Sequence, residues 1–410
     1  MKNTERTIYN NFIQKKYLKN KGSKILRKKY DQIVKKININ IDTQKDIFHS
    51  LSRNFKFNFK AEEIKKFKNF KTVVIIGMGG SVLGAEAIYS FLKKKIKKNF
   101  IFINDIDQNK LEKTKREINL NKALFIIISK SGNTIETFSN LLALKIIKNN
   151  NKYNNKNIIV ISEKNNNPLY LLSKKMKLFH IEHKKFIGGR FSVLSEVGML
   201  PATLMGINII KFRKNLLIHL NLKKEKFLKE SSLKLVNLFK ANKFKNLILF
   251  NYVPELNKFL YWSQQLIAES LGKNNKGFLP VISSAPKDHH SLLQLYLDGS
   301  KDKLFYIFSL EANDKVKITS KTLDKKLIFL NNKTLAQIKK AQKNAFLHVL
   351  KKKEIPFREF KIRNLNEETL GELFSYFILE TVIVGKLANI NPFDQPAVEQ
   401  VKVKTKELLS

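Results

Sequence analysis

The sequence contains no cysteine. Disulfide bonds, thiolate metal sites and cysteine nucleophiles are therefore excluded, and the lack of thiols fits a reducing compartment. Long apolar runs are missing as well, since the longest, 374–388, is interrupted by Glu380 and Lys386 and is too short to span a bilayer. The N-terminal stretch has no apolar core of the signal-peptide type. We therefore expect a soluble, cytoplasmic protein with no membrane partner.

Acidic residues are scarce. The 34 Asp and Glu stand against 78 Lys and Arg, which gives a formal net charge of +44. Such an excess by itself suggests a polyanionic partner. The lysines, however, are spread over the whole chain together with abundant Asn, Ile and Phe, a mixture typical of a bias toward A- and T-rich codons. We expect a solvated lysine-rich surface with no specific nucleic-acid partner, which attracts small anionic substrates.

The first half of the chain shows an α/β pattern. A length of 410 residues allows two or three domains of about 150 residues each. Short β-branched runs occur at 72–77, 100–105, 123–129 and 158–162, with helix-length segments such as 85–98 and 137–150 between several of them. Continuous apolar strands that alternate with helices predict a parallel sheet covered on both faces. The asparagine-rich tract 149–157 predicts a surface loop.

A second series of the same kind begins near Asn246. It predicts strands at 246–253, 303–311, 326–331 and 356–362, with a helix at 254–272. A closing helix starts at about Glu367, where Asn366 could cap it. We therefore predict an α/β protein with two doubly wound parallel-sheet domains. The predicted parts are a helical N-terminal segment, the two domains and a C-terminal helical arm, at 1–60, 61–215, 216–385 and 386–410.

A glycine-rich turn, GMGGSVLG at 77–84, follows the first predicted strand. A strand, a glycine turn and a helix expose backbone N–H groups to an anion. The dinucleotide-binding fingerprint would need a glycine where Val82 stands, and no Gly-Lys-Ser/Thr of a Walker loop follows. The turn is either an anion- or sugar-contacting loop or merely a tight connection between strand and helix.

A second loop, SKSGNTIET at 129–137, also joins a strand to a helix. Four hydroxyl side chains, a lysine and a glycine are packed into nine residues. Hydroxyl and backbone N–H groups can satisfy several phosphate oxygens, and Lys130 adds charge. The alternative is that Ser131 or Thr134 only caps the helix. A single cap does not need so many hydroxyls, so the loop favours phosphate binding.

Further segments place charged and amide side chains beside apolar residues. They contribute Arg190 in GGRFSVLS, Gln265 and Glu269 in QQLIAESLGK, His289 and His290 in DHHSLLQL, and Gln395 and Lys402 in NPFDQPAVEQVKVK. Gln265 and Glu269 are one helical turn apart and so share a face, although an acid on such a helix is ordinarily solvated. No His-x-x-x-His pair accompanies the histidines, and we expect no metal site.

These segments resemble those of a known enzyme family. GMGGS, SKSGNTIET, GGRFSVLS, ESLGK, HSLLQL and NPFDQPAVE occur in the order of the corresponding segments of the glucose-6-phosphate isomerase family, from residue 77 to about 402. The first two alone resemble the sugar-isomerase (SIS) domain, a phosphosugar-binding unit of enzymes and of transcription regulators. The resemblance implies two SIS-type domains and a cofactor-free isomerase of glycolysis and gluconeogenesis, which interconverts glucose 6-phosphate and fructose 6-phosphate. It also implies a homodimer whose active site takes a histidine from the partner subunit.

The resemblance also implies roles for matched residues. Glu269 looks like the base that moves a proton between carbons 2 and 1, and Arg190 like the cation that stabilises the enediolate. His290, assisted by Lys402, looks like the acid and base that open the ring. The substrate-binding positions implied are Gly80, Ser81, Ser129, Lys130, Ser131, Thr134, Glu136, Gln265 and Gln395.

The chemistry of an aldose–ketose isomerisation fits these residue types. Ring opening needs an acid and base that titrates near neutral pH, which histidine supplies. Proton removal beside a carbonyl suits a carboxylate, and an arginine can stabilise the developing negative charge. A dual phosphoglucose/phosphomannose isomerase is an alternative with related domains. A phosphosugar-binding regulator is another, although it would not need Glu269, His290 and Lys402.

Overall fold

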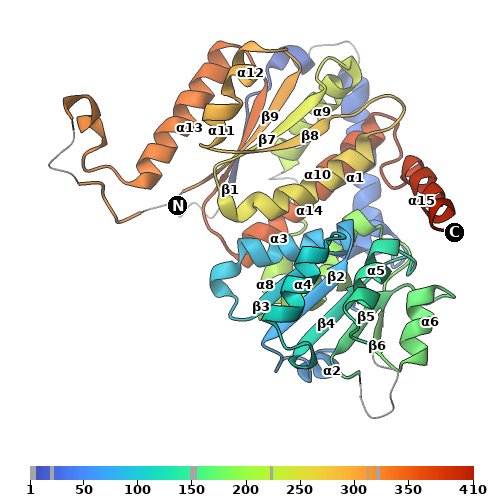
Figure 1. Ribbon diagram of the computed structural model, residues 1–410. Coiled ribbons are helices and arrows are strands. Elements are labelled where there is room, and N and C mark those ends of the chain that lie inside the picture. The colour runs from blue at the N-terminus through green and yellow to red at the C-terminus, as the bar shows by residue number, and fades with distance from the viewer. Residues whose placement is uncertain (1–5, 19–22, 148–154, 222–224, 312–313, 320–323) are drawn as a thin grey trace.

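The computed structural model describes residues 6–18, 23–147, 155–221, 225–311, 314–319 and 324–410 (Figure 1). In this part of the chain, two five-stranded sheets form the centres of the two halves of the molecule. The asparagine-rich tract predicted as a surface loop lies outside the described residues as far as residue 154.

The first sheet is parallel throughout, with the strand order β3-β2-β4-β5-β6. Its strands are β2 (Thr72–Gly77), β3 (Asn99–Ile103), β4 (Ala123–Ile128), β5 (Ile158–Ser162) and β6 (Phe179–Glu182). Val73 and Ile75 of β2 face one apolar cluster, whereas Val74 and Ile76 face another on the opposite side. Continuous apolar strands are required because both faces are covered.

The second sheet has the order β1-β10-β9-β7-β8. Its parallel strands are β7 (Asn246–Asn251), β8 (Leu279–Ser284), β9 (Lys303–Leu310) and β10 (Phe357–Ile362). At one edge β1 (Thr7–Asn11) pairs antiparallel with β10. The predicted fold class, two doubly wound sheets, is thus confirmed, with one antiparallel edge strand added.

Helices cover both sheets. In the first half they include α3 (Leu83–Phe91), α4 (Gln108–Glu117), α5 (Ile135–Ala143), α6 (Pro168–Lys175), α7 (Glu196–Leu204) and α8 (Ile209–Arg213). In the second half they include α9 (Glu225–Ala241), α10 (Asn257–Leu271), α11 (Asp288–Ser291), α12 (Leu293–Asp298), α13 (Leu335–Lys352), α14 (Glu367–Leu387) and α15 (Pro396–Leu409). The N-terminal segment adds α1 (Ser23–Asn40) and α2 (Ala61–Lys65).

Short 3-10 segments connect these elements. They are η1 (Lys15–Leu18), η2 (Ile47–Leu51), η3 (Gly79–Ser81), η4 (Lys93–Lys95), η5 (Leu120–Lys122), η6 (Gly189–Leu194), η7 (Ile218–Leu220), η8 (Pro254–Leu256) and η9 (Lys325–Leu330). No helix among the described residues is long and apolar enough to cross a bilayer.

One local expectation was wrong, and three strands were not predicted. The N-terminal segment is helical in α1 and η2, as predicted, but it also contains the strand β1, whose place is decided by its pairing with β10. The predicted strand 326–331 falls largely in η9, where Ile328 and Phe329 are 63% and 65% exposed and no sheet covers them. The strands β6 and β8 were not predicted. By contrast, α14 begins at Glu367 as expected, and the side chain of Asn366 accepts a bond from the backbone N–H of Thr369.

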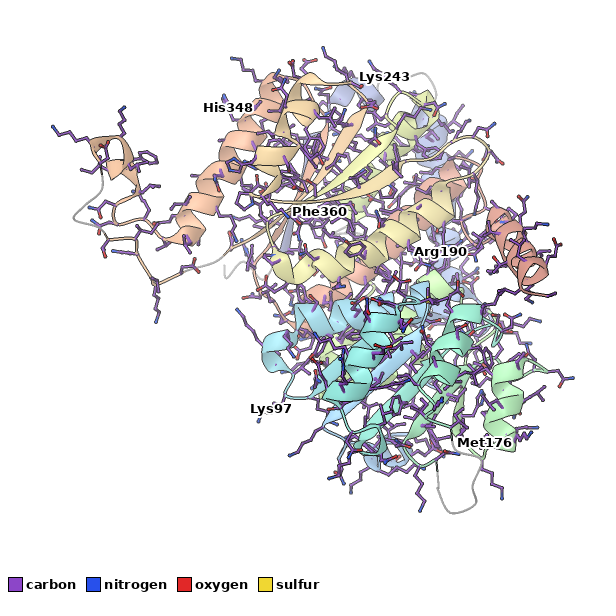
Figure 2. The ribbon with its side chains drawn as sticks, viewed as in Figure 1. Lys97, Met176, Arg190, Lys243, His348 and Phe360 are labelled. Atoms are coloured by element: carbon purple, nitrogen blue, oxygen red, sulfur yellow. The ribbon has the colours of Figure 1, made fainter. Side chains whose placement is uncertain are left out.

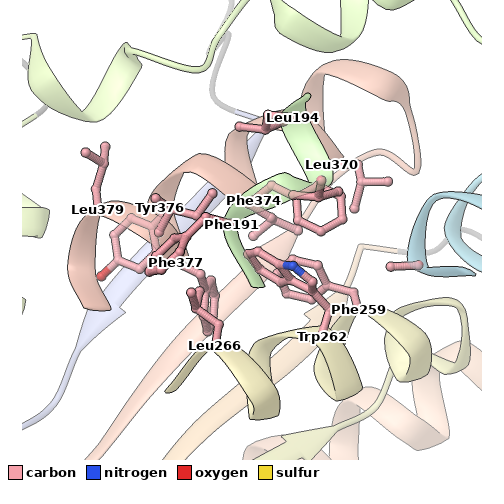
Figure 3. Close-up of a cluster of buried hydrophobic side chains, with 14 of the residues drawn as sticks. Phe191, Leu194, Phe259, Trp262, Leu266, Leu370, Phe374, Tyr376, Phe377 and Leu379 are labelled. Carbon is pink, nitrogen blue, oxygen red and sulfur yellow. The ribbon is translucent and has the colours of Figure 1, made fainter. Parts of the chain in front are cut away.

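One apolar core joins the two halves. Figure 3 shows Phe191 from η6 beside Trp262 from α10 and Phe374 from α14. The rings of Trp262 and Phe374 meet edge to face, with centroids 4.6 Å apart, a geometry that adds to the stabilisation from burial alone. Helix α10 also packs against α3 of the first half. Residues from both halves are therefore packed against each other in one core.

Candidate active site

The two loops with chemical character follow β2 and β4, which are neighbouring strands. From β2 the chain adds β3 on one side and later β4 on the other, so the strand order reverses between them. In open α/β sheets, ligands bind at such a switch point, beyond the carboxyl ends of the strands. The loops 77–84 and 129–137 thus occupy the part of the sheet where a ligand is expected.

The glycine turn after β2 is held against η6. A Cβ atom on Gly80 would lie 2.2 Å from the carbonyl oxygen of Gly189, so only glycine permits this approach. The hydroxyl of Ser192 donates to the carbonyls of Gly80 at 3.3 Å and of Gly189 at 2.7 Å. Ser81 is half-buried at the end of the turn. The turn therefore places Gly80 and Ser81 next to η6, the segment that contains Arg190.

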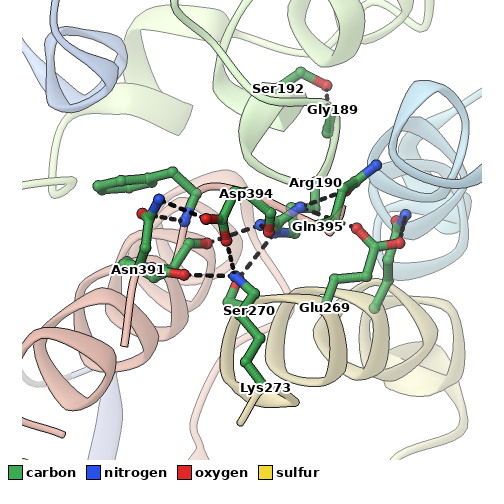
Figure 4. Close-up of polar contacts among 12 residues, drawn as sticks. Gly189, Arg190, Ser192, Glu269, Ser270, Lys273, Asn391, Asp394 and Gln395 are labelled. Atoms are coloured by element: carbon green, nitrogen blue, oxygen red, sulfur yellow. Dashed lines mark hydrogen bonds and ion pairs between the residues drawn. The ribbon is translucent and has the colours of Figure 1, made fainter. Parts of the chain in front are cut away.

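Arg190 lies between the two halves of the molecule (Figure 2) and is 3% exposed. All five of its guanidinium N–H groups find acceptors on α10 and on the loop before α15 (Figure 4). The acceptors are Ser270 Oγ at 2.9 Å from Nε, Glu269 Oε2 at 3.1 Å and Gln395 Oε1 at 2.6 Å from Nη1, and the carbonyl oxygens of Pro392 at 2.8 Å and Asp394 at 2.9 Å from Nη2. Burial lowers the pKa of Arg190, an effect that Glu269 opposes, and a guanidinium in this setting stays charged.

Glu269 and Gln265 share a face of α10, as their spacing predicted. The Nε2 group of Gln265 donates to Oε1 of Glu269 at 2.9 Å, while Arg190 holds Oε2 at 3.1 Å. The side chain of Glu269 nevertheless keeps 27% of its exposure. The Oε1 atom of Gln265 is buried and has no hydrogen-bond partner among the described residues. The pair thus offers an oriented carboxylate and an acceptor ready for a hydroxyl group.

The serine-rich loop forms a compact cluster of hydroxyls after β4. The Oγ atom of Ser129 and the Oγ1 atom of Thr134 are hydrogen-bonded at 2.8 Å, and the backbone N–H of Gly132 donates to Ser129 Oγ at 3.1 Å. Gly132 has φ +65°, and a Cβ atom there would lie 1.8 Å from Oδ1 of Asn167, so glycine is required. Thr134 precedes α5 but makes no side-chain cap bond. The alternative of a simple helix cap is therefore not realised for Thr134.

Lys130 points out of this cluster. Its Nζ donates to the carbonyl of Lys185 at 2.9 Å and lies 3.7 Å from Glu163 Oε1. Burial lowers the pKa of Lys130, although Glu163 opposes the effect. Burial is also the main cause that lowers the pKa of nearby His183 to about 4, and the charge of Lys130 adds to this shift. The ammonium group of Lys130 thus stabilises the loop before η6 by its hydrogen bond to Lys185.

Two further predicted residues of the serine-rich loop lie at its rim. Ser131 is exposed and its hydroxyl donates to Oδ1 of Asn133 at 2.6 Å. Glu136 is half-buried in the first turn of α5, where a carboxylate favours the positive end of the helix dipole.

Neither His290 nor Lys402 has a hydrogen bond or ion pair to Glu269 among the described residues. His290 is exposed on α11. Its neighbour His289 stacks on Phe250, a residue in the apolar cluster on the face of the second sheet away from α10. Lys402 is exposed on α15 and bonds to Glu399 at 2.7 Å.

Three residues that hold the site together were not predicted from the sequence. Ser270 accepts from Arg190, while Lys273 binds Asp394 at 2.6 Å. Ser270, Lys273 and Asp394 all lie in segments already singled out, next to Glu269 or Gln395. Their partners are far away along the chain, so no local signal could have assigned them. In the described part of the chain, no cluster of three His, Asp or Glu side chains is arranged to hold a metal ion.

Comparisons with known proteins agree on one family. The model of the family described as phosphoglucose isomerase matches residues 16–410. A probable glucose-6-phosphate isomerase of Methanococcus maripaludis is 33% identical over 84% of this chain and 80% of its own. The glucose-6-phosphate isomerase of Methanocaldococcus jannaschii is 31% identical over 85% of this chain and 87% of its own.

Solved structures share the fold. A hypothetical protein from Thermus thermophilus superposes with a TM-score of 0.83 at 23% identity, over 98% of this chain and 100% of its own. A glucose-6-phosphate isomerase from Chlamydia trachomatis superposes with a TM-score of 0.75 at 17% identity, over 98% of this chain and 88% of its own. At these identities the likeness concerns the fold alone.

Proposed function

Because the chain belongs to the phosphoglucose isomerase family, we propose that it interconverts glucose 6-phosphate and fructose 6-phosphate. The reaction opens the sugar ring and then moves a proton between carbons 2 and 1 through an enediolate. The observation that carries this proposal is the position of Glu269, which Gln265 and Arg190 orient from two sides while its carboxylate stays open to solvent.

Binding begins at the serine-rich loop. The hydroxyls of Ser129 and Thr134 and the N-terminal turn of α5 receive the phosphate group. Ser131 and Lys130 contribute at the rim, Lys130 chiefly by holding the loop in place. The phosphate is remote from the reacting carbons, so its binding energy can be spent on orienting them. Gly80, Ser81, Glu136, Gln265 and Gln395 complete the substrate contacts.

Proton transfer falls to Glu269. Its carboxylate takes the proton from carbon 2 of the open-chain aldose and returns it to carbon 1, while a proton moves between the oxygens on the same two carbons. Nη1 of Arg190 then stabilises the negative oxygen. The same donor also holds the amide of Gln395, so the positive charge of Arg190 acts on the developing negative oxygen while Gln395 stays in place.

Ring opening falls to His290 with the help of Lys402. His290 is exposed, and its helix α11 lies on the side of the second sheet away from α10. A homodimer in which His290 reaches the partner subunit's Glu269 accounts for both facts. The assembly is part of the proposal.

The decisive experiment offers fructose 6-phosphate to the purified protein and follows glucose 6-phosphate by coupled NADP reduction. Turnover at about 1–10³ per second is expected, the usual range for enzymes. Mannose 6-phosphate is assayed in parallel, since equal turnover of both sugars would make the enzyme a dual isomerase. Tight binding of sugar phosphates with no turnover would instead indicate a regulator and would overturn the proposal.

A further inference from the structure

A lysine outside the proposed chemistry clamps the loop that ends at Gln395. Lys273 follows α10 in a tight turn closed by two backbone bonds with Lys276. Its Nζ lies 2.6 Å from Oδ1 of Asp394 and also donates to the carbonyl of Asn391 (Figure 4). The Lys273 side chain is only 12% exposed, whereas that of Asp394 is 51% exposed. The ion pair is therefore covered on the lysine side only, and the added hydrogen bond to Asn391 fixes its geometry.

Hydrogen bonds within the loop 391–395 hold Asp394 in position for its contact with Lys273. Nδ2 of Asn391 donates to Oδ2 of Asp394 at 2.8 Å, and Oδ1 of Asn391 accepts from the backbone N–H of Phe393 at 3.1 Å. The hydrogen bond to Lys273 holds the pKa of Asp394 below its ordinary value. Lys273 therefore meets a preformed carboxylate and carbonyl on one short turn.

This loop controls two predicted site residues. Its last residue, Gln395, bonds to Arg190, and the helix that follows is α15 with Lys402. No residue of α15 is buried, so packing does not set the direction of that helix. Its direction depends on the loop 391–395, which is held by Arg190 on one side and by Lys273 on the other.

We propose that Lys273 is a positioning residue, whose ion pair with Asp394 fixes Gln395 against Arg190 and aims the helix that carries Lys402. The expected effect of Lys273 on turnover rests on the proposed function, whereas its effect on the position of the loop 391–395 does not. Arg190 anchors the loop through carbonyl groups of Pro392 and Asp394, and these remain when Lys273 is replaced. Loss of Lys273 therefore loosens the loop without detaching it.

The kinetic test compares Lys273→Met with Lys276→Met, a matched change at an exposed lysine of the same turn. Lys273→Met should lower kcat for fructose 6-phosphate about 10- to 100-fold, because a displacement of about 1 Å is enough for that loss. KM should change little, since the serine-rich loop is untouched. Lys276→Met should retain wild-type kinetics, and Lys273→Arg should recover much of the lost rate.

A double-mutant cycle separates positioning from a general loss of structure. If Lys273 acts through Gln395 and the arm, Lys273→Met should cost about two-fold or less in a background that already carries Gln395→Ala and Lys402→Met. A full, independent loss in that background would overturn the inference. So would an unchanged kcat in the single variant.

A measurement without substrate keeps the inference separate from the proposed function. Hydrogen exchange of the free protein should be faster in 391–395 in Lys273→Met than in wild type, with Lys276→Met unchanged. If wild type fails to turn over fructose 6-phosphate, the proposed function falls while this exchange experiment still decides the clamp. Unchanged exchange in Lys273→Met would refute the clamp, whatever the activity.

Discussion

Arg190 and Gln395 are 205 positions apart in the chain, and their side chains meet at 2.6 Å, with Nη1 of the arginine donating to Oε1 of the amide. The contact connects η6, in the first half of the molecule, to the loop that precedes α15. Arg190 is buried and uses every donor it has, so it holds α10 and the loop 391–395 together, and in the proposed reaction it also stabilises the enediolate.

Replacing Arg190 with lysine should separate charge from geometry. Lysine keeps the positive charge but offers three donors from a point, so at least two of the five acceptors lose their partner. Each orphaned buried acceptor costs about 1–3 kcal/mol, so the free energy of unfolding in urea should fall measurably. Turnover should fall at least about 100-fold as Glu269 loses its orientation. Arg27→Lys, an exposed change on α1, is the control, and an equal effect of both changes would contradict the assigned role.

Glu269→Gln tests the base directly. The amide keeps the shape of the side chain but removes the basic oxygen, so kcat should fall about 10²- to 10⁴-fold with little change in KM. Deuterium incorporation from solvent at carbon 2, followed by NMR, should stop. Glu255→Gln, a change at a half-buried carboxylate of η8 just before α10, should leave both unchanged. A Glu269 variant that still exchanges at nearly the wild-type rate would show that another residue is the base.

Thr134→Val removes one hydroxyl of the pair Ser129 and Thr134, the proposed phosphate site, with little change in volume. A hydrogen bond to a charged group is worth about 1.5–3 kcal/mol, so KM should rise roughly 10- to 100-fold with kcat nearly preserved. Inhibition by inorganic phosphate should weaken by the same factor. Ser139→Ala on the exposed side of α5 is the matched control. Phosphate inhibition that is equal in both variants would place the anion elsewhere.

Subunit mixing tests the origin of the histidine. Glu269→Gln and His290→Ala proteins should each be inactive alone, whereas their hybrid dimer contains one site without either change. Random exchange should restore about a quarter of wild-type activity per site, because half of the dimers are hybrids and each has one intact site. Mixing Glu269→Gln with the double variant supplies the control. No recovery despite proven exchange would mean that each subunit supplies its own histidine.

Acid should destabilise the protein through His183. Burial and Lys130 bring its pKa to about 4 in the folded state, against about 6.5 in an unfolded chain. The unfolded state therefore binds the proton more readily, and the stability from this group, complete above about pH 6.5, is lost as the pH falls toward about 4. Integrated, the loss is on the order of 3 kcal/mol.

Urea unfolding of wild type and His183→Gln across this window is the measurement. The difference in stability between the two should shrink as the pH falls from about 7 to about 4 and level off below. The exposed residue His348, changed to Gln, is the control. A difference that stays constant across the window would show that His183 does not titrate in this way.

Much of the fold could be read locally. The apolar runs that became β2, β4 and β5 are buried on both faces, so their composition alone identified them. The cap at Asn366 and the hydroxyl pair Ser129 and Thr134 each involve residues five or fewer positions apart. Interactions at such short range depend on backbone geometry that the nearby residues themselves dictate, which is why the sequence determined them.

Only the tertiary structure decided the rest. β1 became a strand because β10 offered it a free edge, although 349 positions separate Asn10 from its partner Glu359. Lys130 was expected to face the phosphate, yet its ammonium turns to the carbonyl of Lys185. Arg190 gathers its acceptors from α10 and the loop 391–395. The direction of a long side chain depends on which distant groups are packed around it, and these are settled only when both sheets and the helices between them have assembled.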